Sequence, residues 1–292
     1  MSFELTLVAS DSKLFPSLEE YAKFFSGRFD HFEWLKDGLP TYEINATQAY
    51  FENKNTSVSF LFDYFLEMED PEDPTPFPNI QFSISSVCPH FYALEARYEL
   101  EALVDAFDLR LFDQSLGKIV KFDADLFTDC WRQACDLSVK SLGGTKGFEV
   151  IGRELLEIAW LWNRAIPDMY ESSFGTYSAF IPRIFFFKQR RRYCSAVIWG
   201  DAMAIRIPVV DYILVCRREI DNLPKGRVNQ SLISRGEILD VLGEFPVVYE
   251  PYEHVLVDYE SPPPELVERI RNLKVHRGSV PLLNYDKILS GS

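Results

Sequence analysis

The sequence is poor in the residues from which most catalytic and metal sites are built. Its 292 residues include only 4 histidines and 5 cysteines. The chain contains no dinucleotide-binding G-x-G-x-x-G, no P-loop, no G-x-S-x-G and no H-E-x-x-H motif. We therefore expect no cofactor, no metal ion and no catalytic residue, and we expect that the protein is not an enzyme.

The cysteines are odd in number and mostly have apolar neighbours, as is typical of reduced core thiols in a cytosolic protein. Cys130 and Cys135 are five residues apart and would not share a face of a helix, whereas zinc sites use pairs two to four residues apart. The chain does not open with a basic segment followed by an apolar one, and no apolar run approaches the roughly 20 residues of a membrane span. We expect a cytoplasmic protein that does not contact membranes.

The few candidate catalytic groups each have a simpler structural interpretation. Cys88-Pro-His90 brings a thiol and an imidazole close in sequence, but a nucleophile needs an adjacent base held by a third group. His90 is equally well placed to begin a helix. In Asp30-His31-Phe-Glu33 a carboxylate could orient the imidazole, or the segment could be a surface loop. No spacing along the chain singles out two of the 44 carboxylates as a catalytic acid–base pair.

Two short segments resemble sites for anions. The run from Gly143 to Gly147 has the glycines and lysine of a phosphate loop, but it follows a predicted helix, which favours a helix–helix connector. Lys188 and the three residues Arg190 to Arg192 form a basic cluster at a predicted strand turn. Nucleic-acid binding normally needs a broad basic face, so solvent or carboxylates of the same protein are the alternative partners. We expect no nucleic-acid partner.

The net charge of −14 is unevenly distributed along the chain. Residues 1–125 contain 23 Asp and Glu against 9 Lys and Arg, and the remainder contains 21 of each, so the first part carries all the excess. An acidic surface repels nucleic acid and anionic membranes and attracts basic partners. The alternative is that the charge only keeps the protein soluble.

Residues 1–118 are predicted to form one acidic α+β domain. Strands are indicated at 3–8, 47–52, 57–65, 79–87 and 109–112, and helices at 17–27 and 90–107. The first helix begins with a capping box formed by Ser17 and Glu20. The element order resembles a split β-α-β arrangement with an extra strand.

Residues 119–292 are predicted to form a second domain. Helices are indicated at 122–142, 148–165, 235–243 and 261–273, with a strand at 255–259. Four apolar runs between 180 and 217 predict a four-stranded antiparallel meander. The predicted fold class is α+β, with two mixed subdomains, each an antiparallel-rich sheet with helices, joined by a central helical segment.

An acidic, proline-rich loop is the best candidate for a binding site. Five carboxylates and four prolines lie within residues 67–78, which excludes an interior strand or helix. The prolines would reduce the entropy lost on docking, and the carboxylates would speed encounter with a basic surface. The alternatives are a solvated loop and a calcium site, although the EF-hand spacing and glycine are missing. The predicted partner-binding residues are Asp63, Glu67, Glu69, Asp70, Glu72 and Asp73.

These observations favour a non-catalytic protein-binding module whose acidic N-terminal half binds a basic protein. Bacterial immunity proteins, which neutralise a toxin, are one class of this type, and the partner would then be a basic toxin domain. One alternative is an enzyme with an aromatic-lined pocket between the two halves, acting on an unknown substrate. A scaffold component of a larger assembly is another. The sequence does not indicate the oligomeric state.

Overall fold

The computed structural model of the chain describes residues 1–9, 15–28, 40–67, 72, 75–114, 116–172, 179–200, 202–217, 229–243, 247–249, 255–257, 260–273 and 281–291. The chain divides into two units. Unit 1 comprises Met1–Leu156 and Tyr285–Ser292, and unit 2 comprises Glu157–Asn284. The predicted α+β class is confirmed, because helices accompany mostly antiparallel sheets. The predicted domain boundary at residue 118 falls inside unit 1.

Unit 1 is built on a seven-stranded antiparallel sheet with the strand order β2-β3-β4-β5-β1-β6-β7. Its strands are β1 (Ser2–Ala9), β2 (Pro40–Asn45), β3 (Gln48–Asn53), β4 (Val58–Phe65), β5 (Asn79–Ser85), β6 (Leu109–Asp113) and β7 (Lys118–Val120). The four adjacent strands β4, β5, β1 and β6 have the order of a split β-α-β arrangement. The hairpin of β2 and β3 extends this core at one edge, and β7 extends it at the other.

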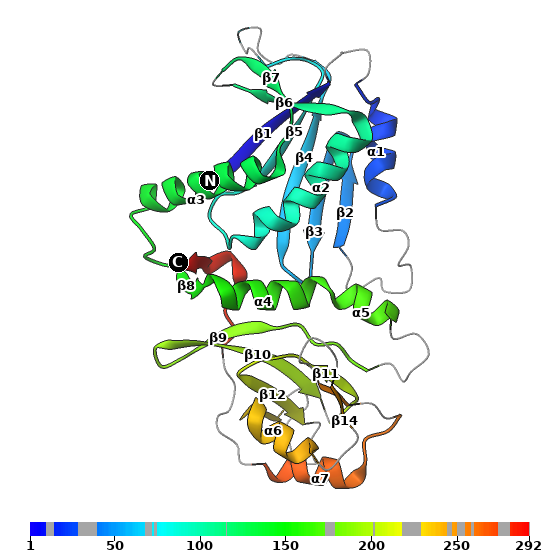
Figure 1. The fold of residues 1–292 in the computed structure, drawn as a ribbon, viewed down its shortest axis with the longest axis vertical. Coiled ribbons are helices and arrows are strands. Elements are labelled where there is room, and N and C mark those ends of the chain that lie inside the picture. Colours follow the sequence, from blue (N-terminus) through cyan, green and yellow to red (C-terminus); the bar gives the residue numbers. More distant parts are fainter. Residues whose placement is uncertain are drawn as a thin grey trace. The chain divides into compact units, whose positions relative to one another are not determined.

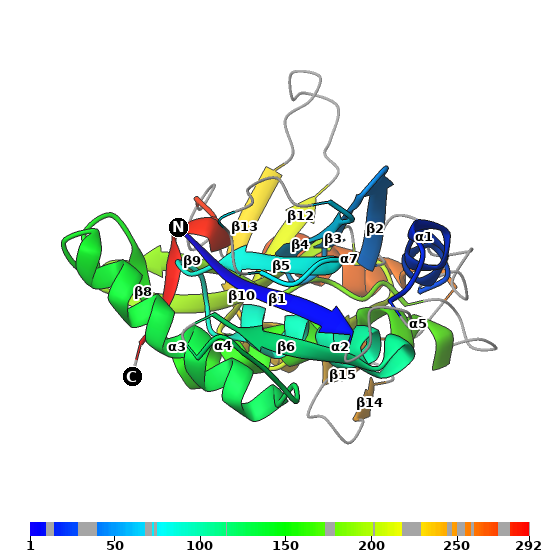
Figure 2. The ribbon, with the colours of Figure 1, turned by 90° about the horizontal axis from the view of Figure 1, so that it is seen from above.

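Three helices pack against one face of this sheet: α1 (Leu18–Ser26), α2 (Phe91–Phe107) and α3 (Ala124–Ser141). Phe25 of α1 packs on Phe62 of β4, with ring centroids 5.1 Å apart, and Phe127 of α3 packs on Phe82 of β5 at 5.9 Å. Tyr92 of α2 donates to the backbone carbonyl of Ser57. Figure 1 shows α2 and α3 in front of the strands, and Figure 2 shows both helices on one side of them.

Local signals in the sequence explain where these helices begin and end. The predicted capping box is present at α1, where Ser17 and Glu20 bond each other's backbone N–H groups. Asp123 caps α3 by accepting from two backbone N–H groups of the first turn. α2 ends at Asp108, whose φ of 47° lies in the left-handed region that Asp tolerates better than most residues.

The chain passes from α3 into a small parallel pairing before it enters unit 2. β8 (Glu149–Gly152) pairs with the C-terminal strand β16 (Ile288–Gly291), which follows the short 3-10 helix η3 (Tyr285–Lys287). The helix α4 (Arg153–Arg164) follows β8, and the boundary between the units falls within it. The predicted helix at 148–165 is therefore wrong in its first turn. The glycine run at 143–147 leads from a helix to a strand rather than to another helix.

Unit 2 contains two small sheets. The four-stranded sheet has the order β13-β12-β10-β9 and consists of β9 (Phe185–Gln189), β10 (Arg192–Gly200), β12 (Tyr212–Arg217) and β13 (Asn229–Ser234). The three-stranded sheet has the order β11-β15-β14 and consists of β11 (Ile205–Ile207), β14 (Val247–Tyr249) and β15 (Val255–Val257). The helices of this unit are α5 (Ile166–Ser172), α6 (Arg235–Leu242) and α7 (Pro264–Asn272).

The predicted four-stranded antiparallel meander is wrong. β9 and β10 form the expected hairpin, but β11 belongs to the other sheet, and β12 pairs with β10 in parallel. Runs of β-branched and aromatic residues indicate strands, but they do not specify which strand lies next to which. All three residues of β11 are buried, which suits a short strand inside a second layer.

None of the helices in the described ranges is long and apolar enough to cross a membrane.

Candidate functional site

The face of the seven-stranded sheet opposite the three helices, which we call the open face, carries the outward side chains of β1 to β5. Successive side chains of a strand point to opposite faces, so the pairing register defines which residues share it. One row across the open face consists of Glu43, Tyr50, Leu61, Ser83 and Glu4. The next row consists of Asn45, Gln48, Asp63, Gln81 and Thr6.

Four carboxylates lie on the open face, and no outward position of β1 to β5 is a lysine or arginine. Three of the four, Glu4, Glu43 and Glu52, are exposed, and Asp63 is half-buried. Within the described ranges, none of these four side chains forms an ion pair with a cation. Exposed Tyr50 and half-buried Leu61 lie in the same row as Glu43, so the surface combines negative charge with apolar contact area.

Neutral donors hold two of these carboxylates in place. Gln48 Nε2 donates to Asp63 Oδ1 at 2.6 Å, and Gln81 Nε2 donates to Glu4 Oε2 at 3.0 Å. Ser2 Oγ donates to the other oxygen of Glu4 at 2.6 Å. Amide and hydroxyl donors orient a carboxylate without cancelling its charge, so the open face keeps its negative potential.

Carboxylates on the helix-covered side have partners in the protein. Arg28 donates twice to Glu99, at 2.9 Å from both Nε and Nη2, and the Tyr42 hydroxyl donates to the same carboxylate at 3.0 Å. Burial and the adjacent Glu99 raise the pKa of Tyr42 well above its usual value. Asn53 Nδ2 donates to buried Glu95 at 2.5 Å. These carboxylates are part of the packing and cannot serve a partner.

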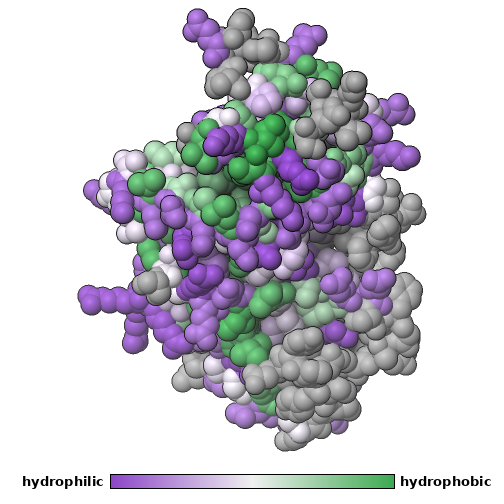
Figure 3. Space-filling model, turned by 45° about the horizontal axis from the view of Figure 1, so that its top comes forward, coloured by the Kyte–Doolittle hydropathy of each residue, from purple (hydrophilic) through white to green (hydrophobic). Residues whose placement is uncertain are grey.

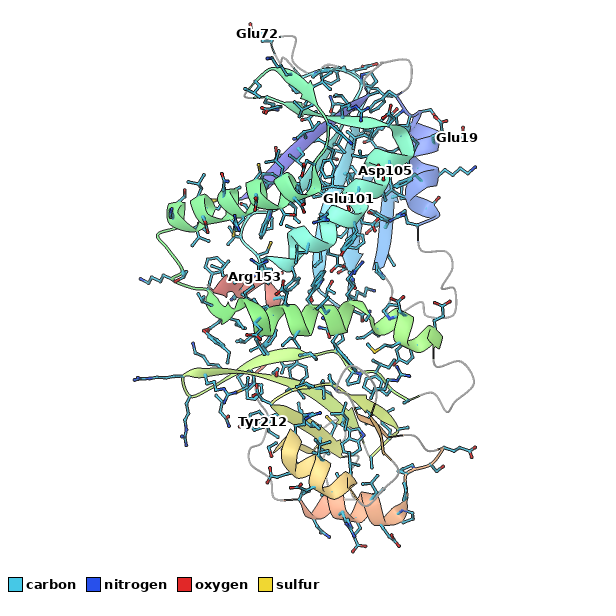
Figure 4. All side chains as sticks on the ribbon, viewed as in Figure 1. Glu19, Glu72, Glu101, Asp105, Arg153 and Tyr212 are labelled. Atoms are coloured by element: carbon cyan, nitrogen blue, oxygen red, sulfur yellow. The ribbon has the colours of Figure 1, made fainter. Side chains whose placement is uncertain are left out.

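Further acids of unit 1 lie outside the open face. Figure 4 labels Glu19 on α1 and Glu101 and Asp105 on α2, among the elements that cover the other side of the sheet. Glu101 forms an ion pair with Arg97, whose Nε lies 3.7 Å from its Oε2. On the side of the molecule drawn in Figure 3, hydrophilic side chains predominate and apolar ones lie among them in small groups.

The predicted binding residues are only partly described by the structure. Asp63 lies on β4 in the open face, and Glu67 is exposed two residues beyond the end of that strand. Glu72, between β4 and β5 in the sequence, is exposed (Figure 4). Glu69, Asp70 and Asp73 lie outside the described residues. Asp63 thus shares the open face with Glu4, Glu43 and Glu52, which the sequence did not single out.

The alternation of polar and apolar residues in each strand was the available signal for Glu4, Glu43 and Glu52. Each occupies one of the polar positions of an alternating strand, but many serines, threonines and glutamines occupy such positions as well. Only the register of five strands shows that these three side chains lie with Asp63 on one surface.

Cys88 and His90, which are close in sequence, each have a hydrogen-bond partner elsewhere. Cys88 Sγ donates to the Ser85 carbonyl at 3.2 Å, and burial raises the pKa of the Cys88 thiol well above its usual value. His90 precedes α2, as predicted, and its Nδ1 lies 2.7 Å from Ser290 Oγ. The raised pKa keeps the thiolate fraction of Cys88 low at physiological pH, so Cys88 can act only as a slow nucleophile. The histidines at positions 31, 254 and 276 lie outside the described residues.

The remaining candidates also have structural partners. Arg192 of the basic turn pairs with Asp211 at 2.8 Å, and Lys188 Nζ lies 5.0 Å from the centroid of the Tyr193 ring. Among the residues that the structure describes, no group of three or more His, Cys, Asp or Glu side chains is placed to hold a metal ion.

Comparison with known proteins identifies no relative: no protein-family model matches the chain, no curated protein matches it in sequence, and no solved structure matches it in fold.

Proposed function

We propose that the protein is a non-catalytic binding module that uses the open face of unit 1 to bind a basic protein partner. The observation that carries this proposal is the absence of any lysine or arginine at the outward positions of β1 to β5, where four carboxylates lie. A surface with one sign of charge speeds encounter with a complementary partner and disfavours partners of the same sign.

The chemistry of the open face suits a protein partner. Tyr50 and Leu61 offer aromatic and aliphatic contact area beside the carboxylates, and tyrosine is enriched in protein interfaces. Asp63 and Glu67 connect this surface to the acidic loop that follows β4. The carboxylates of the loop and of the sheet would therefore act on the same partner.

The experiment compares two variants that remove equal charge from opposite sides of the sheet. The first replaces the open-face acids: Glu4→Gln, Glu43→Gln, Glu52→Gln and Asp63→Asn. The second replaces exposed acids of the helices: Glu19→Gln, Asp105→Asn, Asp129→Asn and Asp136→Asn. Amides keep the size of each side chain, and both variants lose the same net charge.

Binding is measured by fluorescence anisotropy with an unstructured peptide rich in lysine, arginine and tyrosine. At about 0.5 kcal/mol for each exposed charge pair, loss of four open-face carboxylates lowers affinity roughly 30-fold. The helix variant should bind nearly as the parent does. An equal loss of peptide affinity in the two variants would show that net charge alone, and not the open face, attracts the peptide.

Three narrower interpretations stay predictions: that the partner is a basic toxin domain neutralised by an immunity protein, that the protein works in the cytoplasm, and that it binds no nucleic acid. The enzyme with an aromatic-lined pocket between the halves also stays a prediction.

A further inference from the structure

One face of α3 is bonded to the segment that joins β5 to α2. The carbonyl of Ser85 accepts a hydrogen bond from Trp131 Nε1 at 3.0 Å and another from Cys88 Sγ at 3.2 Å. Ser138 Oγ lies 2.8 Å from Ser86 Oγ. Two points of α3, about two turns apart, are therefore held against residues 85–88.

Cys135 lies between these two points on the same face of α3. It follows Trp131 by four residues and precedes Ser138 by three, and residues with these spacings are neighbours on a helix surface. The side chain of Cys135 therefore faces the segment that contains Cys88. Two cysteines that are far apart in sequence thus lie where this face of α3 meets residues 85–88.

We propose that Cys88 and Cys135 are a site of reversible oxidation, at which a hydroperoxide converts the two thiols to a disulfide. In the first step the Cys135 sulfur attacks the peroxide O–O bond, which gives a sulfenic acid and one water. In the second step the Cys88 sulfur attacks the sulfenic sulfur, and hydroxide leaves and takes up the thiol proton as a second water. Two thiols lose two electrons, and one hydrogen peroxide is reduced to two waters.

The order of the steps follows from exposure. Cys88 is only 3% exposed, whereas Cys135 is half-buried, so a small oxidant reaches Cys135 first. Burial raises the pKa of both thiols, which keeps the thiolate fraction low and makes the reaction slow. The adjacent Cys88 then traps the sulfenic acid before further oxidation.

The disulfide would bind α3 covalently to the segment before α2 and close a loop of residues 88–135. The hydrogen bonds of Trp131 and Ser138 already hold these two segments together. This proposal is independent of the proposed binding function, because neither cysteine lies on the open face.

The experiment treats the folded full-length chain with hydrogen peroxide, blocks the remaining thiols with N-ethylmaleimide and digests the protein with trypsin. Trypsin releases Cys88 in the peptide 55–97, Cys135 in 133–140 and Cys130 in 122–132. We expect a mass equal to that of 55–97 joined to 133–140 with two hydrogens fewer, and its disappearance after treatment with dithiothreitol.

Two single variants test whether the reaction depends on this pair. Cys135→Ser should abolish the linked peptide, whereas Cys130→Ser should leave it unchanged, because Cys130 is exposed on a different face of α3. The proposal is overturned if both thiols remain free for alkylation, or if Cys135 advances to sulfinic acid without a link. It is also overturned if the link joins two chains, which a non-reducing gel would show as a dimer.

Discussion

The two faces of the seven-stranded sheet in unit 1 differ in how their carboxylates are paired. On the helix-covered face, Glu99 is bonded to Arg28 and Tyr42, and Glu95 is bonded to Asn53. On the open face, no described cation pairs with the four carboxylates, and the hydrogen-bond donors to Glu4 and Asp63 are neutral.

Burial explains the difference. A carboxylate removed from water costs several kcal/mol unless hydrogen bonds or an opposite charge replace the water, so acids beneath the helices need partners. Exposed acids keep their hydration and need none. Because stability does not require carboxylates on the open face, their presence on β1 to β4 with no lysine or arginine on β1 to β5 calls for another explanation, and binding of a basic partner is the one that we propose.

The largest expected effect concerns the aromatic layer of the helix-covered face. Phe82 is fully buried and contacts Phe60, Phe62 and Phe127, so Phe82→Ala should lower the free energy of unfolding by about 4 kcal/mol. Leu61→Ala on the open face should lower it by only about 1 kcal/mol, because Leu61 is half-buried. Urea unfolding of the two variants provides the measurement. Similar losses would show that the open face is packed as tightly as the other.

The next effect concerns the paired carboxylate. Glu99→Ala removes the carboxylate that accepts hydrogen bonds from Arg28 and Tyr42, which should lower the free energy of unfolding by about 3 kcal/mol. Glu43→Ala, an exposed acid on the open face, should change it by less than about 0.5 kcal/mol. A large loss in Glu43→Ala would contradict the view that the open-face acids are dispensable for folding.

Alkaline pH should destabilise the helix-covered face. Burial raises the pKa of Tyr21, Tyr42 and Tyr92 above the ordinary value of 10.0. The folded state therefore keeps three protons that the unfolded chain loses above pH 10, so stability is unaffected below this pH and falls as pH rises beyond it. The slope is at most about 1.4 kcal/mol per pH unit for each tyrosine. Urea titrations across this range should show a shallower decline in Tyr21→Phe, and an unchanged slope would refute the assignment.

The smallest effect concerns the hydrogen bond between Gln48 and Asp63. Both side chains lie on the open face, where water replaces a lost donor, so Gln48→Ala should lower the free energy of unfolding by no more than about 0.5 kcal/mol. Its effect on binding should also be small, because the Asp63 charge remains. A marked loss of peptide affinity without loss of stability would show that the orientation of Asp63 matters to the partner.

Local parts of the fold could be predicted because their signals lie in adjacent residues. The capping box of Ser17 and Glu20 and the N-cap Asp123 specify backbone hydrogen bonds within one turn. The hairpin of β9 and β10 was predictable for the same reason, since its two strands are separated by a short turn. The pairing of β11 and β12 could not be predicted, because the parallel pairing of β10 with β12 depends on how the whole of unit 2 packs.

Composition and local pattern determine that residues 1–125 carry the excess negative charge, that the chain mixes helices and strands, and that aromatic residues alternate with polar ones in its strands. The tertiary structure alone decides which acids share a surface. Glu4, Glu43, Glu52 and Asp63 lie on four different strands, and only strand order and register bring them to one face. The physical reason is that side-chain alternation selects a face within each strand, whereas strand neighbours are selected by the packing of the entire core.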